Sequence, residues 1–227
     1  ASLRIDIGAP SEKQARSWVK VGQRGTFAST FSLIGSPRRP TTLRGKALDD
    51  RLGVATLIEL LQGDRFACDI CAAFTVQEEI GLRGAKVAAF TFDPTVGFAL
   101  DCTPAADLPP SAPEAENTRY NTRVGAGPAL YVADGHTVGD RRLLAYLERT
   151  ADARSITVQR RQPGGGGTDA GAIHRSRGGI PSLSISVPGR YLHGPYAQAR
   201  VADWRASVEL MRAALSEWPG LRSMRAA

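Results

Sequence analysis

The sequence has few of the residues that cross-link small extracellular domains through disulfides or bind structural zinc. It contains only three cysteines and three histidines. Cys68, Cys71 and Cys102 are too few for a disulfide framework, and the Cys68-x-x-Cys71 spacing has no second ligand pair to form a zinc knuckle. We therefore expect the cysteines to be ordinary buried strand residues, as free cysteines usually are.

Long apolar runs are also missing. No stretch approaches the roughly 18 residues of a membrane-spanning helix, and the opening residues ASLRIDIGAP lack the charged and apolar parts of a secretory signal. The sequence therefore predicts a cytoplasmic protein without a membrane partner. Its 227 residues, 42% of them hydrophobic, are enough to bury the core of one large domain, or of one domain and a fragment of another.

Lysine is scarce beside arginine. Of the 29 basic side chains, 4 are lysines and 25 are arginines, and the formal net charge is +7. Nucleic-acid binding needs basic residues gathered on one face with aromatic residues among them. The pairs Arg38/Arg39, Arg141/Arg142 and Arg160/Arg161 are instead isolated from one another. We interpret this charge as solvated surface and predict no nucleic-acid partner.

The pattern of the chain changes near residue 40. Residues 3–7 and 26–34 are predicted strands, on either side of a helix that Ser11 caps and that extends to Lys20. Residues 35–40 are rich in glycine and proline, which favours a connection. The sequence therefore divides into residues 1–40 and residues 41–227.

Apolar strands alternate with helices after residue 40. We expect helices at 50–62, 84–90, 140–151, 168–174 and 201–218, and strands at 70–76, 96–101, 129–133, 155–160 and 182–187. The strand at 70–76 is apolar on both faces, which is typical of a sheet with helices on both sides. The predicted fold class is α/β, with a mixed, mostly parallel sheet covered on both faces. The polar stretch 104–127 is expected to be a functional or mobile loop.

Acidic residues and one histidine follow the predicted strands. Glu78 and Glu79 come after strand 70–76, Asp101 ends the next strand, Asp49 precedes a helix, and His193 follows the strand at 182–187. Ligands of open α/β sheets bind beyond the carboxyl ends of strands. Mixed carboxylate and imidazole donors suit zinc, cobalt or manganese better than calcium or copper. Taken singly, each residue also fits an ordinary role at a helix start, in a turn or on the surface.

These residues lie in motifs that resemble the cocatalytic metallo-aminopeptidases. That family includes tetrahedral, glutamyl and deblocking aminopeptidases, and some members carry the name endoglucanase. The matching stretches, in the family's order and spacing, are GKALDDRLG, TVQEEIGLRGA, FALDCTPAADLP, GGGTDAGAIH and GIPSLSISVPGRYLH. The resemblance implies a zinc-aminopeptidase-like fold and peptide substrates.

The resemblance also implies a role for each residue. Asp49 would bridge two divalent ions, Asp101 would bind the first, Glu79 and His193 would complete the second, and Glu78 would be the general base. The ions would be zinc, cobalt or manganese. Supporting or substrate-contacting roles would fall to Asp169, Arg190, Gly166, Gly167 and Thr168. Asp50 is expected to cap the helix, and His136 and His174 to be structural.

The family pattern begins with an upstream His-x-Asp segment that this sequence does not contain. The expectation is an N-terminally shortened chain, with residues 1–40 as the C-terminal remnant of an accessory β domain and 41–227 as a catalytic domain without its first strands. Since the first ion would keep only Asp49 and Asp101, we expect one ion to bind well, the second to bind poorly, and peptidase activity to be weak or absent. The intact family forms homo-oligomers.

Two other functions stay open at this point. A glycosidase that uses paired carboxylates would need no metal. A noncatalytic binding or assembly subunit would be consistent with the missing histidine and the basic composition.

Overall fold

The computed structural model describes residues 4–36, 38–105, 107–108 and 122–224. Its elements are α1 (Glu12–Trp18), β1 (Ser32–Ser36), β2 (Arg39–Gly45), α2 (Leu48–Leu61), α3 (Arg83–Phe92), β3 (Gly97–Pro104), β4 (Ala129–Tyr131), α4 (Arg141–Ala153), β5 (Gln159–Arg161), α5 (Ala170–Ile173), β6 (Ser182–Arg190), β7 (Ala197–Arg200), α6 (Val201–Ser216) and a 3₁₀ turn at Leu221–Ser223. The predicted α/β class is confirmed.

The described strands form one mixed sheet of seven strands. β6 lies at its centre, with β3 along one edge and β4 and β7 along the other. β3 runs parallel to β6 from Gly97 opposite Ser182 to Pro104 opposite Gly189. Parallel pairing is otherwise confined to β4 and β5 among the described strands, so the sheet is less parallel than expected. One reason is that β4 runs antiparallel to β6. The other is the presence of β2 and β7, two antiparallel strands that the polar sequences RPTTLRG and AQAR did not reveal.

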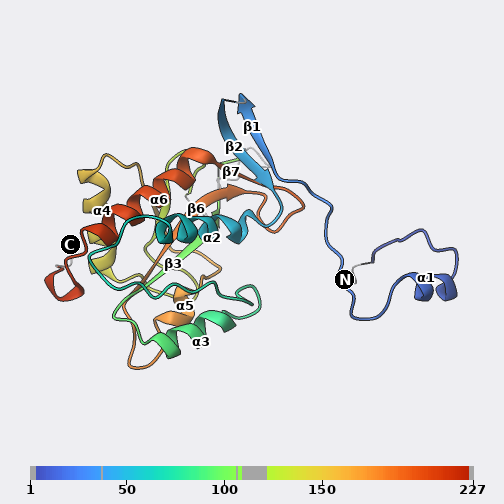
Figure 1. The fold of residues 1–227 in the computed structure, drawn as a ribbon, viewed down its shortest axis with the longest axis horizontal. Helices are drawn as coiled ribbons and strands as arrows, with labels where there is room; N and C mark the ends of the chain where they lie inside the picture. The colour runs from blue at the N-terminus through green and yellow to red at the C-terminus, as the bar shows by residue number, and fades with distance from the viewer. Residues whose placement is uncertain (1–3, 37, 106, 109–121, 225–227) are drawn as a thin grey trace, which may run out of the picture.

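Helices cover both faces of the sheet (Figure 1). α2, α4 and α6 pack together on one face, and α3 and α5 pack on the other. The main core lies beneath α4 and α6, where Leu130, Leu143, Leu147, Leu183 and Leu210 are fully buried. Each such leucine contributes roughly 1.5–3 kcal/mol relative to an exposed one. Within the described part of the chain, no helix has the length and apolar character to cross a membrane.

The first described residues lie apart from the sheet (Figure 1). Ser11 caps α1 as predicted, because its side chain accepts a hydrogen bond from the Gln14 amide. The predicted strands are wrong at residues 4–7 and 26–31, where the backbone is irregular. The expected connection at residues 35–40 instead contains strand residues, because Gly35 pairs with Pro40 and Ser36 with Arg39 at the end of the β1–β2 hairpin. The domain boundary at residue 40 stays a prediction.

The predicted strand at residues 70–76 is also wrong. This segment pairs with no strand among the described residues. Ile70, Phe74 and Val76 are 37%, 52% and 68% exposed. Apolar composition alone therefore did not make a strand here, because a strand needs a partner to pair its backbone groups.

Asp140 begins α4, and its side chain accepts hydrogen bonds from the amides of Arg142 and Leu143. The hydrogen bond from the Arg142 side chain lowers the pKa of Asp140 below 3.8. We expect Asp140→Ala to lower the free energy of unfolding by about 1 kcal/mol at pH 7, as loss of a helix cap does. Because the pKa is lowered in the fold, this contribution is present above pH 3.8 and fades as the pH falls through the folded value.

Urea unfolding at pH 7 and at pH 3 measures this difference. Asp140→Asn is the matched control, since asparagine also caps helices, and it is expected to lose less stability. A cost for Asp140→Ala that is equal at the two pH values would contradict the expectation.

Candidate metal centre

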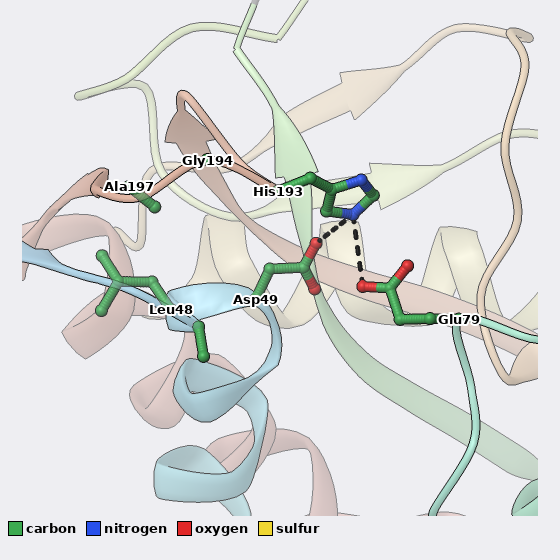
Figure 2. A pocket seen from close by; sticks show the side chains of 7 residues that line it. Leu48, Asp49, Glu79, His193, Gly194 and Ala197 are labelled. Atoms are coloured by element: carbon green, nitrogen blue, oxygen red, sulfur yellow. Dashed lines mark hydrogen bonds and ion pairs between the residues drawn. The ribbon is translucent and has the colours of Figure 1, made fainter. Parts of the chain in front are cut away.

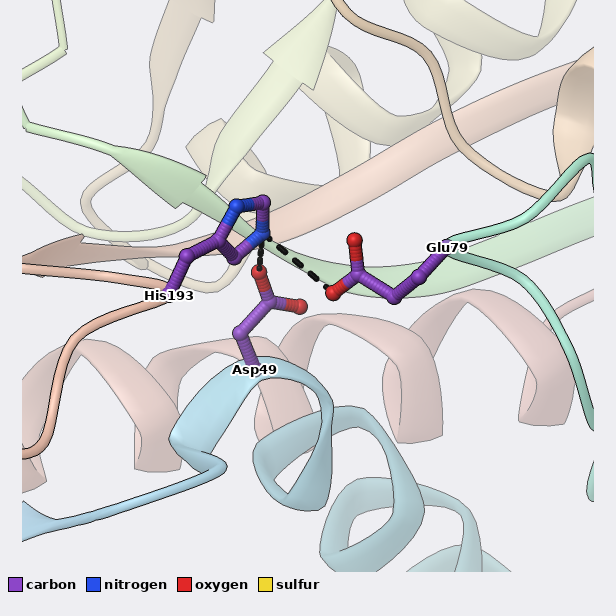
Figure 3. Close-up of side chains that lie close together, drawn as sticks. All are labelled: Asp49, Glu79 and His193. Atoms are coloured by element: carbon purple, nitrogen blue, oxygen red, sulfur yellow. Dashed lines mark hydrogen bonds and ion pairs between the residues drawn. The ribbon is translucent and has the colours of Figure 1, made fainter. Parts of the chain in front are cut away.

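Three side chains from distant parts of the chain converge at the end of the sheet (Figures 2 and 3). The His193 Nε2 atom lies 3.1 Å from Asp49 Oδ2 and 3.3 Å from Glu79 Oε1. One donor atom from each residue lies within 4.8 Å of the other two. These residues line a pocket of about 300 Å³ together with Ala47, Leu48, Gly194 and Ala197. The structure thus brings together three of the four predicted metal ligands in one group.

The start of α2 sets the position of Asp49. Asp49 and Asp50 have non-helical backbone angles within the helix, and the peptide bond between them is cis. Asp50 turns inward and accepts a hydrogen bond of 2.9 Å from the amide of Gly53. A side chain at position 53 would overlap the Asp50 carboxylate and the Leu100 carbonyl oxygen, so only glycine lets α2 approach β3 this closely.

The loop that carries Glu78 and Glu79 is held by the start of α3. The amides of Gly81 and Leu82 both donate to the Glu78 carbonyl, and the amide of Gly84 donates to the Val76 carbonyl. A Cβ atom at position 84 would overlap the Val76 backbone, so glycine is required there as well. The loop therefore presents both glutamates from a position fixed by a helix start, although residues 68–77 directly before it do not form a strand.

His193 lies on a tight turn after β6. Tyr191 and His193 both have positive φ angles, of 59° and 63°. At the foot of the turn, Arg190 donates two hydrogen bonds of 2.8 and 2.9 Å to Asp107. Burial alone would raise the pKa of Asp107, but hydrogen bonds from Arg190 and from the Val124 amide outweigh it and lower that pKa. Arg190 thus anchors the histidine turn through Asp107. Its described hydrogen bonds go to Asp107 and not to the predicted ligands Asp49 and Glu79.

Asp101, the fourth predicted ligand, is a residue of β3, and it lies close to Asp49 at the start of α2. The two carboxylates lie close enough for the charge of Asp49 to help raise the pKa of Asp101. Burial is the largest cause that raises the pKa of Asp101 well above 3.8, and the charge of Asp50 adds to it. Burial likewise raises the pKa of Asp50 to about 8. Without a cation, this concentration of carboxylates is therefore partly neutralised by protons.

Glu78 lies at the inner side of the same cluster. Burial, followed by the charges of Asp169 and Glu79, raises the pKa of Glu78 to about 7. A carboxyl group with a pKa near neutrality is suited to accept and return a proton at physiological pH. Glu78 is not a member of the three-ligand group, unlike its neighbour Glu79.

The predicted supporting residues form a layer behind the cluster. Asp169 was expected to cap a helix or support the ligands; its side chain makes no cap and instead accepts a hydrogen bond of 2.5 Å from Thr75. Thr168 is fully buried and shares a hydrogen bond with Ser184. Gly167 lies against the His136 ring, and the Gly166 carbonyl accepts from the Gly135 amide. The structure therefore assigns these glycines a packing contact with the His136 loop.

Sequence reasoning missed three residues of this region. Asp50 makes the helix-cap hydrogen bond that was expected of it, with the Gly53 amide, but it also forms a second possible donor group with Asp49 and Cys102. Asp107 and Thr75, the partners of Arg190 and Asp169, were not singled out. For Asp50 the sequence offered one signal, the two adjacent acidic residues in DDRLG. For Asp107 and Thr75 it offered none, because their partners Arg190 and Asp169 lie 83 and 94 residues away in the chain.

The donor set fits a small divalent cation. A four-coordinate zinc ion with bonds of about 2.0–2.2 Å holds its ligands about 3.3 Å apart, close to the observed 3.1 and 3.3 Å between His193 and the two carboxylates. Two carboxylates and an imidazole also match the preferences of zinc, cobalt and manganese. The His193 and Glu79 side chains are 66% and 60% exposed, so an ion has direct access from solvent.

A mixed sheet between two layers of helices, with carboxylates and an imidazole at its end, defines an α/β protein with a candidate metal centre. The chain belongs to the M42 glutamyl aminopeptidase family, which it matches over residues 1–210. It is 33% identical over 219 residues to lysyl aminopeptidase of Pyrococcus furiosus, which covers 95% of this chain.

Solved structures show the same likeness. A TET aminopeptidase from a marine sediment thaumarchaeon superimposes with a TM-score of 0.83 at 33% identity, covering 94% of this chain and 59% of that one. A TET peptidase of Pyrococcus horikoshii, described as assembling into a tetrahedron or a large octahedral shell, gives 0.73 at 30% identity and covers 93% of this chain and 60% of that one. The chain spans 60% of the length of the lysyl aminopeptidase.

Proposed function

We propose that this chain is the metal-binding part of an aminopeptidase, which removes N-terminal residues from peptides. The observation that carries the proposal is the convergence of Asp49, Glu79 and His193 within 4.8 Å, beside a glutamate whose pKa lies near 7. Membership of the M42 family supports peptide bonds as the target. Zinc is the proposed ion, with cobalt or manganese as replacements, because each accepts mixed carboxylate and imidazole donors.

Each residue has a proposed role in that reaction. Asp49, Glu79 and His193 would hold one ion, and Asp49 and Asp101 would contribute to a second. When bound, such ions supply Lewis acidity that polarises a peptide carbonyl and eases the loss of a proton from water. Glu78 would accept the proton of the attacking water on its carboxylate and return it to the departing amine. Asp169 and Arg190 would position the loops of Glu78 and His193.

Two finer features are also proposed. The chain would act as a homo-oligomer, as the TET peptidase of P. horikoshii does. It would be located in the cytoplasm, since Cys68, Cys71 and Cys102 are all free thiols and cytosolic proteins keep thiols reduced.

Release of a chromophore from an aminoacyl anilide tests the function. In line with the weak activity expected from the sequence, we expect slow release that stops on addition of a chelator and returns with zinc or cobalt. Cellulose cleavage that is insensitive to the chelator would favour a glycosidase instead. No chelator-sensitive release from any aminoacyl anilide would favour a noncatalytic role.

A further inference from the structure

The segment that leads into β1 lies against the candidate metal centre. This segment, the strap (residues 27–31), is neither helix nor strand. In Figure 1 the chain enters β1 here, on its way from the separate α1 to the sheet. The strap contacts the corner between β2 and α2, which leads into Asp49, and the histidine turn (residues 191–196), which carries His193. One segment therefore touches the backbone of two predicted ligands.

The strap is joined to the histidine turn by a hydrogen bond. The Ser29 hydroxyl donates to the Pro195 carbonyl oxygen at 2.5 Å, between residues that are 166 positions apart in the chain. Pro195 lies two residues after His193. The pair between Arg190 and Asp107 holds the other side of the same turn. The turn is thus fixed before His193 by Asp107 and after His193 by the strap.

The strap is also joined to the corner between β2 and α2. The Lys46 ammonium group donates to the Phe27 carbonyl oxygen at 2.7 Å. A Cβ atom at Gly45 would lie 3.3 Å from a carbon of the Phe31 ring, so that ring lies on the backbone of the corner. Lys46 precedes Asp49 by three residues. The strap therefore holds the backbone that leads into Asp49 as well as the histidine turn.

The histidine turn depends on outside contacts for its shape. Tyr191 and His193 have positive φ angles, which residues other than glycine keep only where the surrounding structure enforces them. The His193 side chain is 66% exposed, so packing around its ring restrains it little. Arg44 hydrogen-bonds to Ser32, directly after the strap, and its guanidinium group lies 5.1 Å from the centre of the Tyr196 ring. Contacts from the strap and the adjoining hairpin thus hold the part of the turn that follows His193.

Metal affinity is sensitive to how ligands are held. Ligands need to stay within about 0.5 Å of their productive positions, and outer contacts that orient a ligand typically contribute about 10- to 100-fold in affinity. His193 lies 3.1 Å from Asp49, and the strap contacts the backbone on both sides of this pair. Loosening the strap would therefore let the two donors move apart.

We propose that Ser29 and Lys46 are positioning residues of the metal centre, which hold the histidine turn near Asp49 through the strap and so raise the affinity for the ion. Neither side chain would touch the ion. The inference rests on the proposed metal centre, but the two can fail separately. A parent protein that binds no zinc refutes the metal centre, whereas a parent that binds zinc no better than the strap variants refutes the strap alone.

The test compares the zinc affinity of the parent with that of Ser29→Ala and Lys46→Met, by competition with a chromophoric chelator. We expect each variant to bind zinc about tenfold more weakly, at the lower end of the effect of outer contacts. The double variant should lose less than the product of the two, because contacts within one network are not additive. With cobalt in place of zinc, the visible absorption bands should change in both variants, since they report ligand geometry.

Three control variants separate positioning from folding. Ser29→Thr keeps the hydroxyl group and should bind zinc as the parent does. Ser17→Ala removes a similar hydrogen bond, from the Ser17 hydroxyl to the Gln14 carbonyl within α1, and Lys86→Met removes an exposed charge on α3. Both should leave zinc affinity unchanged. Urea unfolding without zinc should give the same free energy for the parent and for every variant.

Three results overturn the proposal. The first is a zinc affinity and a cobalt spectrum that stay the same in Ser29→Ala and Lys46→Met. The second is an equal loss of affinity in Ser17→Ala or in Ser29→Thr. The third is a loss of affinity matched by an equal loss in the free energy of unfolding without zinc, because the strap would then support the fold as a whole.

Discussion

Replacing Glu78 by glutamine is expected to lower aminopeptidase turnover by about 10²- to 10⁴-fold, the usual contribution of a positioned general base. The amide has nearly the same shape as the carboxylate but cannot accept the proton of the attacking water. Glu78 lies outside the three-ligand group, so zinc affinity should change little. Hydrolysis of an aminoacyl anilide and calorimetric zinc titration on the same preparation separate the two effects.

Glu59→Gln is the matched control for this substitution. Glu59 lies on α2 with a side chain that is 49% exposed, and its nearest cation is Arg212 at 4.0 Å. Its loss should leave both turnover and zinc binding unchanged. A Glu78→Gln protein that keeps turnover within a few-fold of the parent would show that another group takes the proton.

Replacing His193 by alanine is expected to remove most of the zinc affinity. Loss of a residue that merely supports a ligand typically costs about 10- to 100-fold in affinity, and a direct ligand should cost at least as much. The parent protein should bind one ion tightly, because Asp49 and Asp101 are the only predicted ligands left for a second. Calorimetric titration measures both the affinity and the stoichiometry.

Thermal unfolding gives an independent measure of the same site. Zinc at a hundredfold excess over its Kd should stabilise the parent by about 2.7 kcal/mol, which corresponds to a rise in Tm of about 5–10 °C for a chain of this length. His193→Ala should show little of this rise. The control is His174→Gln, whose ring contacts the Ala170 carbonyl away from the cluster. Two tight ions per chain, or a full zinc response in His193→Ala, would contradict the assignment.

Helices were the most predictable part of the fold. Ser11 and Asp140 mark the starts of α1 and α4 in the sequence as they do in the structure, because a cap acts within three residues. Strands were less predictable, since their stability comes from partners far along the chain. The segment at residues 70–76 has a clear strand composition and no partner among the described residues, whereas the polar β2 is a strand because it pairs with β1 and β7.

The candidate site was predictable as far as its motifs extend. Asp49, Glu79 and His193 were singled out in the sequence and lie together in space. The contacts that support them were not predictable, because the Arg190–Asp107 and Thr75–Asp169 pairs depend on how loops pack after the sheet has formed. The inward turn of Asp50 also depends on tertiary packing, through the approach of α2 to β3 at Gly53.

The exposure of His193 and Glu79 affects which metal ion the candidate site would take up. Donors at a solvent-facing rim exchange an ion with the surroundings while the sheet and helices stay folded. Affinity alone favours the later first-row elements, so proteins commonly depend on geometry and on local supply to select a metal. A rim of two carboxylates and one imidazole imposes little geometric selection, and its occupant should therefore follow the local supply of free divalent ions.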